Sequence, residues 1–128
     1  MDLKKALKPL LFSWLLIPGF ASAVTPGDFE VNTTKDLIDL CTTSSEDPKY
    51  QAAIHFCHGY LVGAYHYHAA SKNTAESSQL VCFPKPMPSR NTAIAKVIFW
   101  AQEHPEYMTE TPVETEFRAL ADIWPCKK

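Results

Sequence analysis

The side chains best suited to metal binding or nucleophilic catalysis in this sequence are five histidines and four cysteines. The histidines are His55, His58, His66, His68 and His104. They form no His-x-x-x-His pair, and no carboxylate recurs beside them at the spacing of a zinc site. Cys57 and His58 are neighbours that point apart on a helix, so they do not form a nucleophile and its base. We therefore expect no metal, no cofactor and no enzymatic activity.

The overall composition excludes further classes of protein. The chain has 128 residues, of which 46% are hydrophobic and 20% charged, with a formal net charge of −2. It is too apolar for a disordered chain and lacks the basic excess that neutralises nucleic-acid phosphates. Its four glycines form no phosphate-binding motif. These features indicate a single globular domain that does not bind nucleic acid.

The N-terminus has the composition of a cleaved secretory signal peptide. Its positive region contains three lysines, Lys4, Lys5 and Lys8. A mostly apolar run from Leu10 to Phe20 follows, and Ala21-Ser22-Ala23 supplies small residues at the cleavage site. The run is too short for a membrane span, which needs about 20 residues. We expect residues 1–23 to be removed and residues 24–128 to fold in an oxidising compartment.

An even number of cysteines in a small exported chain favours disulfides over a metal site. The four cysteines are Cys41, Cys57, Cys82 and Cys126, and no C-x-x-C pair occurs. Two structural bridges are therefore expected, and three pairings are possible.

The segment after residue 32 has the pattern of a first helix. Thr33 fits its N-cap, with an acidic residue three positions later. Leu37, Ile38 and Cys41 then share one face. We expect residues 24–32, which precede the helix, to be irregular.

A second helix is expected over residues 48–71, with Pro48 in its first turn. Apolar residues cover most of its circumference, which predicts a central helix surrounded by the others. Gly59 and Gly63 lie on one face of this helix, where their missing side chains would let a neighbour approach closely.

The third and fourth helices have clear start signals. Ser89 fits the N-cap of a helix over residues 90–104, and Thr111-Pro112-Val113-Glu114 has the pattern of a capping box. The fourth helix has an apolar stripe at helical spacing, formed by Val113, Phe117, Leu120, Ala121 and Trp124. Pro125 ends this helix, and no convincing strand occurs.

These elements predict an all-α, four-helix domain held by two disulfides. If the third and fourth helices form an antiparallel hairpin, Cys82 and Cys126 lie together at its open end. Cys41 and Cys57 would then join the first helix to the second. A bridge between Cys57 and Cys82 is the alternative, because a long second helix also brings Cys57 towards the loop that follows it.

An acidic segment separates the third helix from the fourth. From Ala101 to Glu116 the sequence contains five glutamates and neither lysine nor arginine. One interpretation is a solvated loop whose acidic residues favour a helix N-terminus. The functional interpretation is an acidic surface that meets a basic cleft on a partner protein. The candidate partner-binding residues are Glu106, Tyr107, Met108 and Glu110.

Four short motifs in order resemble the Rap/Tai family of immunity proteins. They are Phe56-Cys57-His58-Gly59-Tyr60-Leu61-Val62-Gly63-Ala64, Val81-Cys82-Phe83-Pro84, His104-Pro105-Glu106 and Ile123-Trp124-Pro125-Cys126. The resemblance covers roughly residues 35–126. Its motif residues are Gly59, Tyr60, Leu61, Gly63, Pro84, Pro105, Trp124 and Pro125.

The resemblance implies a small α-helical, often dimeric, periplasmic protein without enzymatic activity. It further implies that the chain binds a peptidoglycan amidase effector of the type VI secretion system and occludes its active-site cleft. The alternative is a periplasmic acid-stress chaperone of the HdeA type, which has a similar small disulfide-linked helical fold. Abundant histidines and carboxyl groups would make such a chaperone strongly cationic at low pH.

Overall fold

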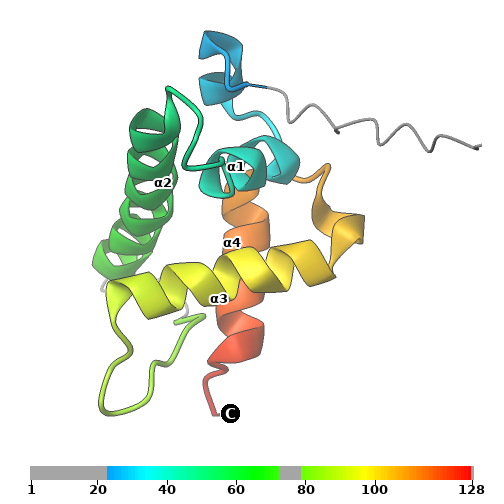
Figure 1. The fold of residues 1–128 in the computed structure, drawn as a ribbon. Coiled ribbons are helices and arrows are strands. Elements are labelled where there is room, and N and C mark those ends of the chain that lie inside the picture. Colours follow the sequence, from blue (N-terminus) through cyan, green and yellow to red (C-terminus); the bar gives the residue numbers. More distant parts are fainter. Residues whose placement is uncertain (1–22, 73–78, 128) are drawn as a thin grey trace, which may run out of the picture.

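The computed structural model describes residues 23–72 and 79–127, and these residues form an all-α domain (Figure 1). In chain order the elements are η1 (Pro26–Glu30), α1 (Thr34–Cys41), α2 (Tyr50–Ser71), α3 (Arg90–Glu103), η2 (Pro105–Tyr107) and α4 (Pro112–Ile123). The predicted four-helix fold is confirmed. The predicted signal peptide lies outside the described residues, apart from Ala23. None of the helices in the described ranges has the length and hydropathy of a membrane span.

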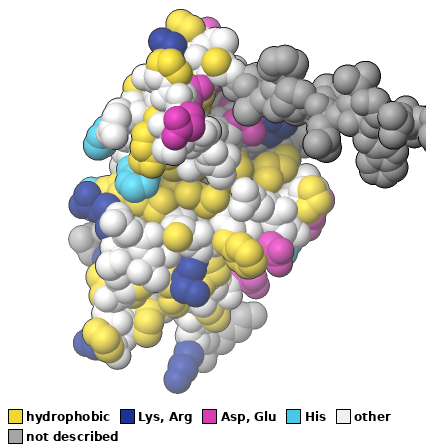
Figure 2. Space-filling view, in the orientation of Figure 1, with side chains coloured by type: hydrophobic (Ala, Val, Ile, Leu, Met, Phe, Trp, Pro, Cys, Tyr) yellow, Lys and Arg dark blue, Asp and Glu magenta, His cyan; other side chains and the backbone are white. Residues whose placement is uncertain are grey.

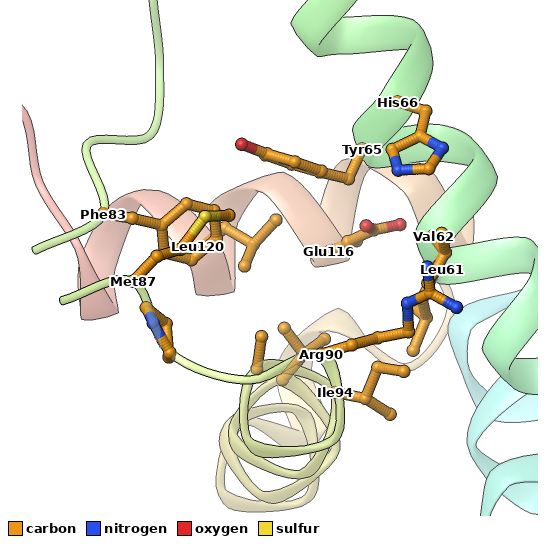
Figure 3. A pocket seen from close by; sticks show the side chains of 13 residues that line it. Leu61, Val62, Tyr65, His66, Phe83, Met87, Arg90, Ile94, Glu116 and Leu120 are labelled. Atoms are coloured by element: carbon orange, nitrogen blue, oxygen red, sulfur yellow. The ribbon is translucent and has the colours of Figure 1, made fainter. Parts of the chain in front are cut away.

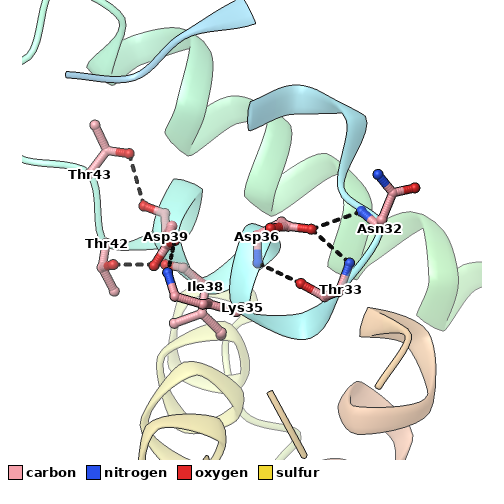
Figure 4. A network of polar contacts seen from close by, with 8 residues as sticks. All are labelled: Asn32, Thr33, Lys35, Asp36, Ile38, Asp39, Thr42 and Thr43. Carbon is pink, nitrogen blue, oxygen red and sulfur yellow. Dashed lines mark hydrogen bonds and ion pairs between the residues drawn. The ribbon is translucent and has the colours of Figure 1, made fainter. Parts of the chain in front are cut away.

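Thr33 begins α1 as predicted, through a reciprocal pair of hydrogen bonds (Figure 4). The N–H of Asp36 donates to the hydroxyl oxygen of Thr33 at 3.3 Å. The carboxylate of Asp36 accepts from the N–H groups of Thr33 and Asn32, at 2.8 and 3.1 Å. These bonds, chiefly the one from Thr33, hold the pKa of Asp36 below its usual range.

We expected the segment before α1 to be irregular, but part of it is helical. Residues Pro26–Glu30 form the 3-10 helix η1. Its start is fixed locally, because the carboxylate of Asp28 accepts from the N–H of Thr25 at 2.6 Å. Pro26 supplies a backbone angle already suited to a first turn.

Helix α2 begins two residues later than predicted, at Tyr50. Pro48 lies in a turn instead, where the N–H of Tyr50 donates to the carbonyl oxygen of Asp47 at 2.9 Å. The carboxylate of Asp47 accepts from the N–H groups of Lys49 and Val24, at 2.7 and 2.8 Å. These bonds stabilise the turn, so the helix begins only after it.

The prediction that α2 is central is wrong. Figure 1 shows α2 at one side of the molecule, and its fully buried residues are Ala53, Cys57 and Leu61. Tyr67 is 78% exposed. The expected close packing at Gly59 and Gly63 is also wrong, because a Cβ atom added to either glycine meets nothing within 4 Å. Each of the four helices contacts the other three, so none of them is enclosed by the rest.

The buried face of α4 differs from the predicted stripe. Its buried residues are Pro112, Thr115, Glu116, Ala119 and Leu120. Val113, predicted to be in the core, is 39% exposed, and Phe117 is only partly buried. The two patterns share Leu120 and differ by a rotation of the helix. The apolar spacing alone favoured the wrong rotation, because the true inner face includes a threonine and a glutamate.

Both predicted disulfides are present, Cys41–Cys57 and Cys82–Cys126. The expected antiparallel hairpin is not, because α3 crosses α4 (Figure 1). The segment before α3 instead brings Cys82 to the end of α4. There the N–H of Cys82 donates to the carbonyl oxygen of Trp124 at 3.0 Å, and Val81 forms an isolated bridge with Pro125.

Candidate functional site

The acidic loop, which we define as residues 104–111, is held against the first turn of α1. The N–H of Thr34 donates to the carbonyl oxygen of Glu110 at 2.8 Å. The N–H of Lys35 donates to the carbonyl oxygen of Met108 at 2.9 Å. First-turn N–H groups find no partner within their own helix. Because the acidic loop supplies these partners, the loop and α1 position each other.

A buried pair of threonines ties the acidic loop to α4 as well. The hydroxyl oxygens of Thr34 and Thr115 lie 2.7 Å apart, and each residue is 2% exposed. The Thr34 hydroxyl also lies 3.1 Å from the carbonyl oxygen of Glu110. The Thr115 hydroxyl lies 3.4 Å from the carbonyl oxygen of Tyr107. Buried hydroxyl groups need such partners, so the pair fixes the loop backbone at two points.

Side chains of the acidic loop belong to a column of stacked rings. The ring centroid of Trp100 lies 3.8 Å from that of His104 and 5.6 Å from that of Tyr107. The guanidinium carbon of Arg118 lies 5.0 Å from the Tyr107 centroid, a cation–π distance. Arg118 also donates to the carboxylate oxygens of Glu110 at 3.0 and 3.4 Å. The column holds the loop from its outer side.

The four predicted partner-binding residues lie together in the structure, but their side chains are not equally exposed. Tyr107, Met108 and Glu110 are half-buried, and Tyr107 and Glu110 make the internal contacts described above. Glu106 is exposed, and its carboxylate makes no hydrogen bond or ion pair with any residue that the structure describes. Glu106 is therefore the residue of this set best placed to meet a partner. A partner-binding role for the four residues stays a prediction.

A second candidate site is a pocket of about 320 Å³ between α2, α3 and α4. Hydrophobic side chains gather between α2 and α3 on the face seen in Figure 2. The walls of the pocket include Leu61 and Val62 of α2, Ile94 and Val97 of α3, and Leu120 of α4. It is an apolar pocket with polar groups at only a few points.

The carboxyl group of Glu116 projects into this pocket, with Tyr65, His66 and Arg90 around it (Figure 3). Glu116 is 2% exposed, and its Oε2 atom has no hydrogen-bond partner among the described residues. Burial raises the pKa of Glu116 from 4.5 to about 8. The same burial effect, with a smaller contribution from Glu116, raises the pKa of Tyr60. At neutral pH most Glu116 side chains are therefore protonated and uncharged.

Glu116 was not predicted as a site residue, because in the sequence it is only one of five glutamates in the acidic segment. A signal was available, because Pro112, Ala119 and Leu120 recur with Glu116 at helical spacing. The stripe through Val113 and Phe117 was equally regular and more hydrophobic. Only the packing of α4 against the other helices distinguishes the two faces.

The histidines are distributed over the surface and the edge of the core. His55 and His66 are exposed, and His104 is stacked in the ring column. The ring of His68 packs 4.8 Å from that of Phe117, and its Nε2 atom is buried without a partner in the described part of the chain. Across residues 23–72 and 79–127, no group of three or more His, Cys, Asp or Glu side chains is arranged to hold a metal ion.

The residues that carry the family resemblance are spread over the fold. Gly59 and Gly63 lie on the exposed side of α2, and Leu61 lies in the core. Pro105 opens η2. Trp124 packs on Phe83 with ring centroids 4.7 Å apart. Tyr60, Pro84 and Pro125 complete the set. Most of these residues shape the fold, and the motif does not by itself define a binding surface.

Comparison with known proteins identifies the family. No curated protein and no solved structure matches this chain. The family model described as Rap1a immunity proteins matches residues 33–126, which include α1 to α4, both disulfides, the acidic loop and the pocket. This chain belongs to the Rap1a immunity protein family.

Proposed function

We propose that this protein binds a peptidoglycan amidase effector of the type VI secretion system and protects its producer by occluding the active-site cleft. The family match over residues 33–126 carries the proposal, because an immunity protein acts by binding a partner effector. The amidase target follows from the motif resemblance described above. The site of action is the periplasm, where an amidase reaches the cell wall and where disulfides persist.

The acidic loop is the surface that we propose enters the cleft. It is bonded to α1, packed through Thr115 on α4 and stacked on α3, so little ordering entropy is lost on association. Its exposed carboxylate, Glu106, can meet basic groups at the rim of a cleft. Tyr107 and Met108 add contact area beside it.

Co-expression in the bacterial periplasm tests the function directly. Each candidate amidase from the same genome is exported with and without this protein, and cell lysis is measured. Protection against one amidase, with a stable complex of the two purified proteins, is the expected result. Protection against none of the amidases, although the protein accumulates in the periplasm, contradicts the proposal.

A charge reversal tests the surface. Glu106→Lys is expected to weaken the complex at least about tenfold, because it places a cation opposite the basic rim. Glu46→Lys is the matched control, since Glu46 is an exposed acidic residue in the turn before α2. Equal affinity of both variants and the wild type would exclude the acidic loop as the contact surface. Circular dichroism verifies that both variants stay folded.

Intact mass of the periplasmic protein tests export. We expect a chain that begins at Val24 and resists alkylation until reductant is added. Recovery of the unprocessed chain from the cytoplasm would contradict the periplasmic site.

The buried carboxyl group opposes the alternative of an acid-activated chaperone. Such a chaperone must loosen when the pH falls. Because the pKa of Glu116 is raised to about 8, its contribution to stability increases as the pH falls towards 4.5. Asp36 and Asp47, whose pKa values are lowered, act in the opposite direction. Loss of helicity and binding of a hydrophobic dye at about pH 3 would favour the chaperone instead.

A further inference from the structure

We propose that the pocket between α2, α3 and α4 is a binding site for a small apolar molecule that carries one primary ammonium group, with Glu116 as its counter-ion. This site is separate from the acidic loop, and the proposal does not depend on the amidase partner.

The unpartnered carboxyl group of Glu116 indicates that this pocket binds a ligand. Buried polar atoms in folded proteins are nearly always hydrogen-bonded, and the exceptions call for an explanation. Glu116 is 2% exposed, yet its Oε2 atom has no partner among the described residues. An ammonium group provides three N–H donors and a positive charge, which are the partners that this carboxyl group lacks.

The size and lining of the pocket fit a small apolar molecule. Its volume of about 320 Å³ lies at the lower end of the range for small-ligand sites. The walls are mainly aliphatic and aromatic, with Phe83 and Met87 closing one side (Figure 3). Such walls favour an alkyl or aryl body over a polar one. A body of about six to eight carbon atoms is the class that this volume admits.

Other titratable groups surround Glu116, but none of them forms an ion pair with it in the described part of the chain. From α2 these are Tyr60, Tyr65 and His66, and from α3 the group is Arg90. His66 and Arg90 are exposed, so water screens the positive charge of Arg90. No ion pair joins Arg90 to Glu116 in the described part of the chain. The carboxyl group therefore lies in the pocket without an ion pair and is available to an incoming cation.

A consequence of this arrangement is proton release. Glu116 is mostly protonated in the empty pocket at neutral pH, because its pKa is raised to about 8. A bound ammonium group favours the ionised carboxylate, so the carboxyl proton passes to the buffer when the amine binds. The ligand keeps its own proton. About one proton per bound amine is therefore expected at pH 7.

Titration calorimetry of the oxidised protein tests the proposal with hexylamine and hexan-1-ol, which are similar in size and differ in charge. We expect hexylamine to bind at least about tenfold more tightly than hexan-1-ol. In phosphate and MOPS buffers at pH 7 its binding enthalpies should differ by the heat of transferring one proton. Binding of neither probe, or equal binding of both, overturns the proposal.

Two further measurements assign the effect to Glu116. Glu116→Gln keeps the shape of the side chain and should abolish both the preference for the amine and the proton release, with hexan-1-ol affinity unchanged. Glu103→Gln, a change at an exposed glutamate of α3, should leave all three quantities unchanged. Tighter binding of hexanoate than of hexylamine would mean that Arg90 and His66 select an anion, and it would refute the assignment.

Discussion

Replacing Glu116 by glutamine is expected to make the protein more stable, although the side chain lies in its interior. The substitution keeps the volume and an uncharged polar group, and it removes the possibility of ionisation. In the wild type, folding keeps Glu116 protonated at a pH where the unfolded chain releases that proton. This proton uptake lowers the stability of the wild type, and the glutamine variant does not require it.

The magnitude follows from the pKa of Glu116, which burial raises from 4.5 to about 8. Each pKa unit corresponds to about 1.4 kcal/mol, so the full effect above pH 8 is ~5 kcal/mol. At pH 7 the unfolded carboxyl group is ionised and the folded one mostly is not, which gives ~3 kcal/mol. At pH 5 the effect falls below ~1 kcal/mol. The advantage of the variant should therefore grow by about 2–3 kcal/mol between pH 5 and pH 7.

Urea denaturation with intact disulfides, followed by circular dichroism, measures this difference at pH 5, 6 and 7. The contributions of all other groups are common to both proteins and cancel when the two curves are subtracted. Glu103→Gln serves as the control, because this exposed glutamate should give a difference near zero at every pH. A difference between Glu116→Gln and wild type that is independent of pH would refute the reasoning.

Three further substitutions test the contacts that hold the fold. Thr115→Val removes the buried hydroxyl pair with Thr34 and should lower the free energy of unfolding by ~1–2 kcal/mol in urea titrations, whereas an unchanged value would mean the pair contributes nothing. Thr33→Ala removes the N-cap of α1 and should lower it by about 1 kcal/mol, with a loss of helicity confined to that helix by hydrogen exchange. Joint replacement of Cys82 and Cys126 by alanine should lower it by ~2–5 kcal/mol, and an unaltered melting temperature would contradict this.

The helix starts were predictable because their causes are local. Thr33 and Ser89 each accept a hydrogen bond from an N–H three residues later, and this spacing is visible in the sequence. At Thr111 the same signal marks the correct start through a different bond. There the hydroxyl of Thr111 donates to the carboxylate of Glu114 at 2.7 Å, and the side chain does not cap the backbone. Local patterns therefore located the helices well.

The arrangement of the helices was less predictable because its causes are long-range. Thr115 lies on the inner face of α4 because Thr34, 81 residues earlier, provides its hydroxyl partner. No local pattern records that contact, and the apolar spacing through Val113 indicated another face. For the same reason α2 was placed at the centre. Its alanines, glycines and aromatic residues look apolar in the sequence, although many face solvent in the fold.

The candidate sites also combine a feature that the sequence reveals with features that only the structure shows. The acidic loop was found from its charge, which composition reveals. Its attachment to α1, through the carbonyl groups of Met108 and Glu110, was not found, because backbone acceptors carry no sequence signal. The pocket also required the structure, since its walls come from three helices and the loop before α3.

The order of the two disulfides along the chain affects how they form and what a backbone cleavage does to the protein. Cys41 pairs with Cys57, the next cysteine, and Cys82 pairs with Cys126, the last one, at separations of 16 and 44 residues. In a chain that emerges N-terminus first into an oxidising compartment, each new pair of thiols is already the native pair. Oxidation in order of emergence thus gives the correct bridges without reshuffling. The two covalent loops also do not overlap, so one backbone cut between Cys57 and Cys82 leaves two halves that separate in urea without reductant.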